Sequence, residues 1–199
     1  MAKYTEYRGV TGLVYAKVTK DTEEAYETGE VKSLAGVAKI TKTTEVSNET
    51  HYYDNIPAIN VSSTGADEIT LTVSAIPLDV LADITGQMYD ETTGALIEGE
   101  RSNDYFAIGY VTENTDNESM YVWRLKGSFA IPDSTHVTKD DGTDANGQEL
   151  VFTGIQTTHK FTKTGKGATG VVVNASLGLA DVSTFFDTVT TPDTLKSKA

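Results

Sequence analysis

The sequence predicts a mainly β protein, a β-sandwich or barrel with one flanking α-helix. Stretches rich in Thr, Val, Ile, Tyr and Phe recur along the chain, separated by clusters of Gly, Asn, Asp and Ser. This composition is typical of short strands joined by turns, and several stretches alternate apolar and polar residues. Because 199 residues suit one compact domain, residues 1–199 are expected to form a single unit.

Seven stretches are predicted to be strands. They are residues 12–18, 37–43, 68–75, 105–112, 120–131, 150–161 and 169–176. The clearest hairpin joins residues 105–111 to residues 120–125 through a polar run. Because bulky side chains at period two mark a buried sheet face, its two strands are expected to share one core face. That face would comprise Phe106, Ile108, Tyr110, Tyr121, Trp123 and Leu125.

Residues 77–85 carry the start and stop signals of a helix. Pro77 suits the first helical position, and Gly86 suits a left-handed stop after the last turn. A second, weaker helix is predicted at residues 182–189. A polar tail is expected to follow, at about residues 190–199.

Long polar segments interrupt the predicted strands at residues 41–64, 89–103 and 132–149. Structureless loops of this length are uncommon in compact domains unless they have a function. We therefore expect inter-subunit loops, which become ordered against a neighbouring copy of the chain. Simple surface mobility is the alternative for each loop.

The charge and cysteine content exclude several classes of protein. The chain contains no Cys, so disulfides, thiolate metal sites and a cysteine nucleophile are impossible. The formal net charge of -13 disfavours tight binding to DNA, which depends on Lys and Arg displacing counterions. The N-terminal residues lack the apolar region of a signal peptide, and no apolar run has the length of a membrane span, so secretion and membrane insertion are not expected.

Catalytic and metal-binding motifs are weak. His51, His136 and His159 are far apart and lack ligand spacing. Gly165, Gly167 and Gly170 spell Gly-x-Gly-x-x-Gly, but the Val run that follows predicts a strand instead of the helix that a dinucleotide site needs. We expect a glycine-rich hairpin tip there.

An acidic segment superficially resembles a calcium site, with Asp140, Asp141, Asp144 and Glu149. In EF-hand spacing two obligatory carboxylates would be missing, so a solvated loop is the preferred interpretation and irregular calcium binding the alternative. Neither an enzyme activity nor a cofactor or metal is expected.

Two surfaces are predicted to contact neighbouring subunits. The first is the segment His51, Tyr52, Tyr53, Asp54, Asn55, Ile56 and Pro57, which is rich in apolar and aromatic residues within a polar region. The second pairs a local basic island, with Lys160, Lys163 and Lys166, with the acidic loop Asp140, Asp141 and Asp144 of a neighbour. Opposite charges at such a contact would fix its register.

Four short segments carry a family resemblance through their order and spacing. They are Gly12-Leu13-Val14-Tyr15-Ala16, followed by the Tyr26 turn and Leu34-Ala35-Gly36; Tyr52-Tyr53-Asp54-Asn55; the passage from Ile76-Pro77-Leu78 to Thr85-Gly86-Gln87; and the late hairpin, with Phe106-Ala107-Ile108-Gly109-Tyr110, Tyr121-Val122-Trp123 and Lys126-Gly127-Ser128-Phe129. Over nearly the whole chain they resemble the major tail protein family of long-tailed bacteriophages of Gram-positive bacteria. The second segment is similar to a Tyr-Ala-Asp-Asn motif of that family and departs from it at Tyr53.

The resemblance implies a β-sandwich or barrel of the tail-tube type, assembled as stacked hexameric rings around a DNA channel. Its partners would be further copies of itself, a tape-measure protein, other tail proteins and phage DNA passing without tight binding. It would be found in the virion tail after assembly in the host cytoplasm. The net charge favours an acidic channel wall. A tail-terminator or head-tail joining ring protein and a monomeric β-sandwich binding module remain alternatives.

Overall fold

The computed structural model describes residues 4–138 and 146–198, and about half of these residues lie in β-strands. The elements are β1 (Tyr7–Asp21), β2 (Tyr26–Thr28), β3 (Lys32–Ser33), β4 (Val37–Tyr53), β5 (Ile56–Val73), α1 (Leu78–Thr85), β6 (Met88–Asp90), β7 (Ala95–Ile97), β8 (Phe106–Asn114), β9 (Ser119–Phe129), β10 (Gln148–Gly154), β11 (Gly170–Asn174) and the 3-10 turn η1 (Ala175–Leu177). Each of the seven predicted stretches contains a strand. The prediction of a mainly β fold with one flanking α-helix is confirmed for the described residues.

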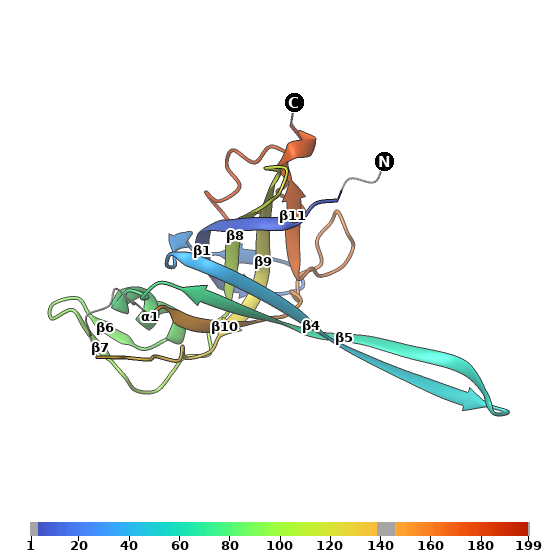
Figure 1. Cartoon of the computed structure of the whole chain (residues 1–199), viewed down its shortest axis with the longest axis horizontal. Helices are drawn as coiled ribbons and strands as arrows, with labels where there is room; N and C mark the ends of the chain where they lie inside the picture. The colour runs from blue at the N-terminus through green and yellow to red at the C-terminus, as the bar shows by residue number, and fades with distance from the viewer. Residues whose placement is uncertain (1–3, 139–145, 199) are drawn as a thin grey trace.

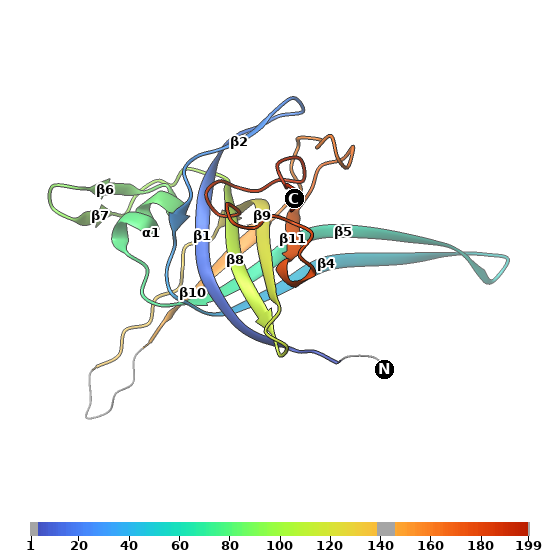
Figure 2. The same ribbon diagram turned by 90° about the horizontal axis from the view of Figure 1, so that it is seen from above.

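One antiparallel sheet organises the molecule (Figure 1). Its strand order is β2-β1-β8-β9-β10-β5-β4, with β3 paired to β1 and β11 paired to β9. The short hairpin β6–β7 forms a separate sheet. Figure 2 shows β1 curving alongside β8 across the body of the molecule.

The sheet divides at the end of β9. Along one edge, β9 pairs with β11 over residues 120–124 and with β10 over residues 127–129. Gly127 occupies the division, where a Cβ atom would lie 2.4 Å from the Phe152 ring and 2.4 Å from the Thr153 carbonyl oxygen. Only glycine permits this close approach of β10.

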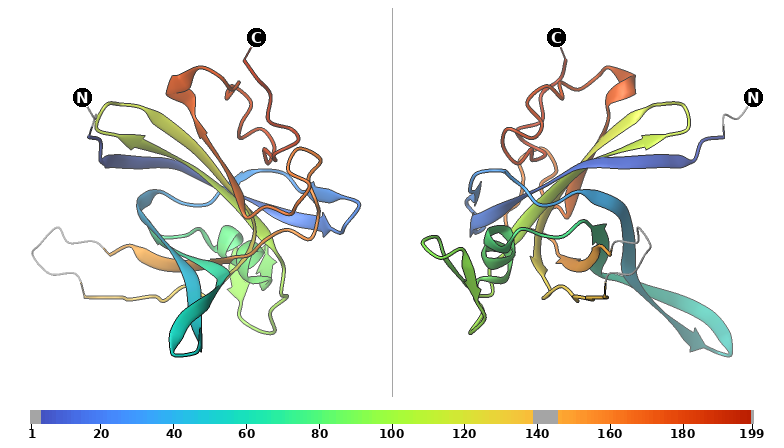
Figure 3. Two further views of the ribbon diagram at one scale, coloured as in Figure 1. Left: turned by 90° about the vertical axis from the view of Figure 1, so that its right-hand side faces the viewer. Right: turned by 60° about the vertical axis from the view of Figure 1, so that its left-hand side comes forward.

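Because the sheet divides and curls, its strands form two crossing layers, with β1, β8 and β9 facing β10, β5 and β4 (Figure 3). The space between them holds the first core cluster. Phe106, Ile108 and Tyr110 of β8 meet residues of β5 and β10 there, including Leu71 and Phe152. The helix α1 contributes Ile84 to the same cluster.

The opposite face of the hairpin β8–β9 is also buried, in a second cluster around Trp123 and Leu125. The prediction of one shared core face is therefore wrong, because Trp123 lies opposite Gly109 and not opposite a bulky residue. A Cβ atom on Gly109 would come within 3.0 Å of the Trp123 ring. Small residues on one face of β8 make room for the indole, which a pattern of bulky residues alone does not reveal.

The C-terminal segment covers this second cluster. Trp123 Nε1 donates a hydrogen bond of 2.9 Å to the carbonyl oxygen of Phe185, and Thr190 Oγ1 donates to the same oxygen. The predicted helix at residues 182–189 is wrong: these residues form successive turns. A segment rich in Thr and Val has low helix propensity, and burial of Phe185 and Val189 holds it against the sheet. Residues 190 and 191, expected within a polar tail, are buried.

The helix α1 begins after Pro77, which occupies the cap position, and ends at Gly86. Gly86 has a φ of 68°, the left-handed conformation that glycine adopts most easily. Ala82, Ile84 and Thr85 are the buried residues of the helix.

The long polar segments differ from the expected loops. Residues 41–64 are almost entirely strand, in the hairpin β4–β5, and residues 89–103 include most of the hairpin β6–β7. A strand with two solvated faces is polar throughout, so its composition resembles that of a loop. This is why the sequence predicted loops in these segments. The segment at residues 132–149 lies partly outside the described residues.

Candidate assembly interface

The outer part of the hairpin β4–β5 projects from the body as a two-stranded arm (Figures 1 and 2). We define the arm as residues 45–65, all of which are exposed. From Lys42, where the arm joins the body, to Tyr53 at its tip, a strand rise of about 3.3 Å per residue gives a reach of about 36 Å. An isolated two-stranded hairpin is marginally stable in water and normally needs a layer that packs against it. Because all the residues of the arm are exposed, the arm lacks such a layer in the free subunit.

A tight turn forms the tip of the arm. Asp54 and Asn55 have φ values of 52° and 64°, and Tyr53 pairs directly with Ile56. Two central residues with positive φ identify a type I′ turn, whose twist matches that of the flanking strands. Asn and Asp tolerate this conformation better than other non-glycine residues. The predicted interface segment at residues 51–57 is thus a hairpin tip, not a loop.

Pairing along the arm places four of its six large apolar side chains on one face. His51 lies opposite Ile59, Glu49 lies opposite Val61, and the register shifts by one residue between His51 and Tyr52. Directly opposed residues share a face, and residues two apart on one strand also share it. The shared face consequently carries four large apolar side chains: Tyr53, Ile56, Ile59 and Val61, which are 60%, 63%, 50% and 51% exposed.

The opposite face of the arm is more polar. It presents Asn48 with Ser62 and Thr50 with Asn60, while Val46 and Tyr52 lie toward its two ends. Ile59 and Val61 were not predicted as interface residues. Their alternation with Asn60 has the period of two residues that is typical of a strand. The prediction of a loop over residues 41–64 did not take this alternation into account.

A buried carboxylate fixes the arm to the body. Asp67 of β5 is 6% exposed. It accepts a hydrogen bond of 2.6 Å from Thr44 Oγ1, Lys42 Nζ lies 2.8 Å away, and Arg124 of β9 lies 4.0 Å away. Burial alone would raise the pKa of Asp67, but the hydrogen bonds from Lys42 and Thr44 and the charge of Arg124 lower it overall. Asp67 therefore remains ionised at neutral pH, and it ties both strands of the arm to the central hairpin.

The arm also leaves a strand edge open. β4 is the last strand in the sheet order, and the described residues pair only one of its edges. Unpaired edges are a template for further strand pairing, so proteins usually cover or blunt them. An open edge of 17 residues, together with an exposed apolar face, indicates a surface that a partner covers.

The predicted basic surface lies on the body, away from the arm tip (Figures 1 and 2). Residues 159–166, the basic segment, form a compact turn closed by a bridge between Phe161 and Lys166. Lys160 Nζ is 3.5 Å from Glu23 of the same chain, and Asp193 accepts a hydrogen bond of 2.9 Å from the Lys163 backbone. The expected partner loop with Asp140, Asp141 and Asp144 lies outside the described residues, so that contact stays a prediction.

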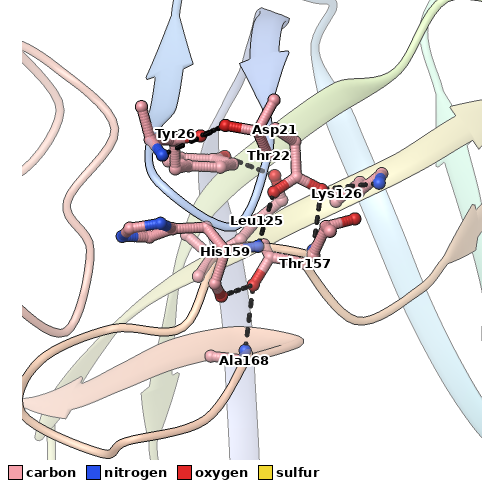
Figure 4. Close-up of polar contacts among 10 residues, drawn as sticks. Asp21, Thr22, Tyr26, Leu125, Lys126, Thr157, His159 and Ala168 are labelled. Atoms are coloured by element: carbon pink, nitrogen blue, oxygen red, sulfur yellow. Dashed lines mark hydrogen bonds and ion pairs between the residues drawn. The ribbon is translucent and has the colours of Figure 1, made fainter.

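The segment that precedes the basic turn is held by a buried ion pair (Figure 4). Lys126 Nζ lies 2.6 Å from Asp21 Oδ2, with side chains 10% and 5% exposed. The backbone N–H groups of Thr158 and His159 also donate to Asp21, and Tyr26 donates to the Leu125 carbonyl. Burial alone would raise the pKa of Asp21, but these hydrogen bonds outweigh it and lower the pKa. The Asp21 contacts connect β1, β9 and the loop that carries the lysines, so the three lysines have a rigid base.

The described residues also bear on the metal, glycine-rich and membrane motifs of the sequence. No three His, Asp or Glu side chains within residues 4–138 and 146–198 gather in a geometry that could bind a metal. The glycine-rich motif leads into β11, as the glycine-rich hairpin prediction requires. No helix in the described ranges is both long and apolar enough to cross a membrane. A scan against protein-family models and a search of curated proteins found no match to this chain.

Proposed function

We propose that this protein is a structural subunit that polymerises, and specifically the tail tube protein of a long-tailed bacteriophage. The observation that carries the proposal is the arm: residues 45–65 project as an uncovered hairpin with four exposed apolar side chains on one face. A binding module for a small molecule has no use for a marginal hairpin of this reach. A subunit whose arm contacts the next copy does, because assembly supplies the missing layer.

The arm favours head-to-tail assembly over a symmetric dimer. It lies at one end of the long axis of the molecule, and the hairpin β6–β7 lies at the other (Figure 1). A contact between an arm and a different surface of the next copy is heterologous, and such contacts generate rings or open polymers. Stacked hexameric rings contain both kinds of assembly: the subunits of one ring form a closed circle, and the rings stack into a polymer that can grow along the tube.

The charge is compatible with a channel for DNA. With a net charge of -13 per subunit, a ring repeats a mostly acidic surface, which would repel the phosphate backbone and let DNA slide. The basic segment is the part of the chain most able to reverse that sign locally. We expect it to lie outside the channel.

Electron microscopy of the purified protein over a range of concentrations tests the proposal. Tubes with a regular axial repeat and sixfold symmetry are the expected result. Closed rings that never stack would indicate a tail-terminator or head-tail joining protein. A protein that stays monomeric at all concentrations in analytical ultracentrifugation would overturn the assembly proposal and favour a binding module.

A further inference from the structure

A groove with a mainly apolar lining lies beside the base of the arm. It has a volume of about 470 Å³ and lies between the start of β1, the base of β4 and the centre of the sheet. Its apolar lining includes Tyr7, Val10, Ile40, Tyr110 and Val172. Two of these are largely exposed, Tyr7 at 75% and Val172 at 56%. The volume falls within the roughly 300–1,000 Å³ typical of binding pockets.

The groove has a positive rim in an otherwise acidic protein. Lys39, Lys42 and Arg124 line it. The buried carboxylate of Asp67 lies near Lys42 and Arg124. Lys39 has no ion-pair partner among residues 4–138 and 146–198. The groove therefore combines an apolar floor with an excess of positive charge.

The arm has complementary chemistry. Its 21 residues include Glu45, Glu49 and Asp54 but neither Lys nor Arg. Its tip presents Tyr53 and Ile56 side by side, a pair of side chains that the groove can hold together. The arm cannot fill the groove of its own chain, because it points away from the body and its tip is about 36 Å from its base.

We propose, resting on the assembly proposed above, that the groove receives the arm tip of a second copy of this chain. The apolar side chains of the tip enter between β1 and β11, and the acidic groups of the arm approach the Lys39 side of the rim. Charge complementarity favours this groove over another exposed apolar surface, the hairpin β6–β7 with Met88 and Ile97. That hairpin is flanked by acidic residues, which would repel the arm: Asp90, Glu91, Glu98 and Glu100.

The lack of Cys allows a clean cross-linking test. Three single variants are purified separately: Ile56→Cys at the arm tip, Val172→Cys in the groove, and Ile97→Cys on the competing hairpin. All three positions are more than half exposed, at 63%, 56% and 51%, so folding should be unaffected. Subunits with Ile56→Cys carry a size tag and are mixed with either of the other two under mild oxidation, and mixed disulfide dimers are quantified on non-reducing gels.

We expect Ile56→Cys to cross-link to Val172→Cys at least tenfold faster than to Ile97→Cys, and Lys39→Glu in the groove subunit to slow that reaction at low salt. Equal rates, faster reaction with Ile97→Cys, or no mixed dimer with Val172→Cys would overturn the groove assignment. If tubes form but the groove cross-link does not, the proposed function stands and only the docking of the arm tip in the groove is refuted. If the groove cross-link forms but tubes do not, the docking stands and the tail-tube function is refuted.

Discussion

Weakening the apolar face of the arm should impair assembly without impairing folding. In the double variant Ile56→Ser and Ile59→Ser, the lost side chains are 63% and 50% exposed in the free subunit. Complete burial of an exposed Ile contributes about 1.5–3 kcal/mol, so covering these remaining surfaces would stabilise the contact by about 2–3 kcal/mol in total. Since 1.4 kcal/mol is a factor of ten, the critical concentration for polymerisation should rise about 30- to 140-fold.

Pelleting of polymer over a concentration series, with electron microscopy of the pellets, measures this critical concentration. The matched control is Val46→Ser, because Val46 is 56% exposed but lies on the opposite face of the arm. Per substitution it loses similar strand propensity without touching the apolar face. Thermal unfolding of the free subunits should be nearly the same for both variants and the wild type, since exposed substitutions usually shift stability by less than about 0.5 kcal/mol.

An unchanged critical concentration in the double variant would refute the assignment of this face to a contact. An equal effect of Val46→Ser would show that the arm acts through its strand structure and not through one apolar face. A large loss of folding stability in the free subunit would mean that the arm packs on its own chain.

Three further predictions concern the body of the molecule. Asp21→Asn should cost about 3–5 kcal/mol of unfolding free energy at neutral pH, because it leaves a buried lysine unpaired. Since the folded-state pKa of Asp21 is lowered, the greater stability of the wild type should disappear as pH falls below about 4. Urea unfolding over a pH series measures this difference. Gly127→Ala should cost about 1–3 kcal/mol in the same assay because its methyl would lie 2.4 Å from a buried ring, whereas Gly99→Ala, with open space around it, should be neutral. Changing Lys160, Lys163 and Lys166 to Glu should slow polymerisation at low salt and have a smaller effect at about 1 M salt, where the Debye length is about 3 Å. Light scattering measures the rate of polymerisation. Equal slowing at all salt concentrations would contradict an electrostatic contact.

Much of the strand framework could be predicted because its signals are local. β-branched and aromatic composition with period-two alternation identified a strand in all seven expected stretches. Pro77 and Gly86 bounded the helix because cap conformations depend on neighbouring residues alone. The interface segment was singled out by Tyr52 and Tyr53, and the following Asp-Asn pair is itself a turn signal.

The faces and coverings could not be predicted in the same way. Trp123 belongs to a different core cluster from Tyr110 because the C-terminal segment, 62 residues further along the chain, closes over it. The groove exists because the start of β1 and the base of β4, which are far apart in the sequence, come together with residues of β8, β9 and β11 in the curled sheet. Periodicity reports that a strand has two faces but not what lies against each.

By itself, the sequence determined the β class, the helix and its ends, the acidic balance, and a cluster of apolar residues within a polar region. Only the tertiary structure decided that this region is a paired arm without a covering layer and that four of its six large apolar side chains share one face. The physical reason is range. Turns, caps and strand propensity depend on residues a few positions apart, whereas exposure depends on whether any distant part of the chain packs on the arm, and among the described residues none does.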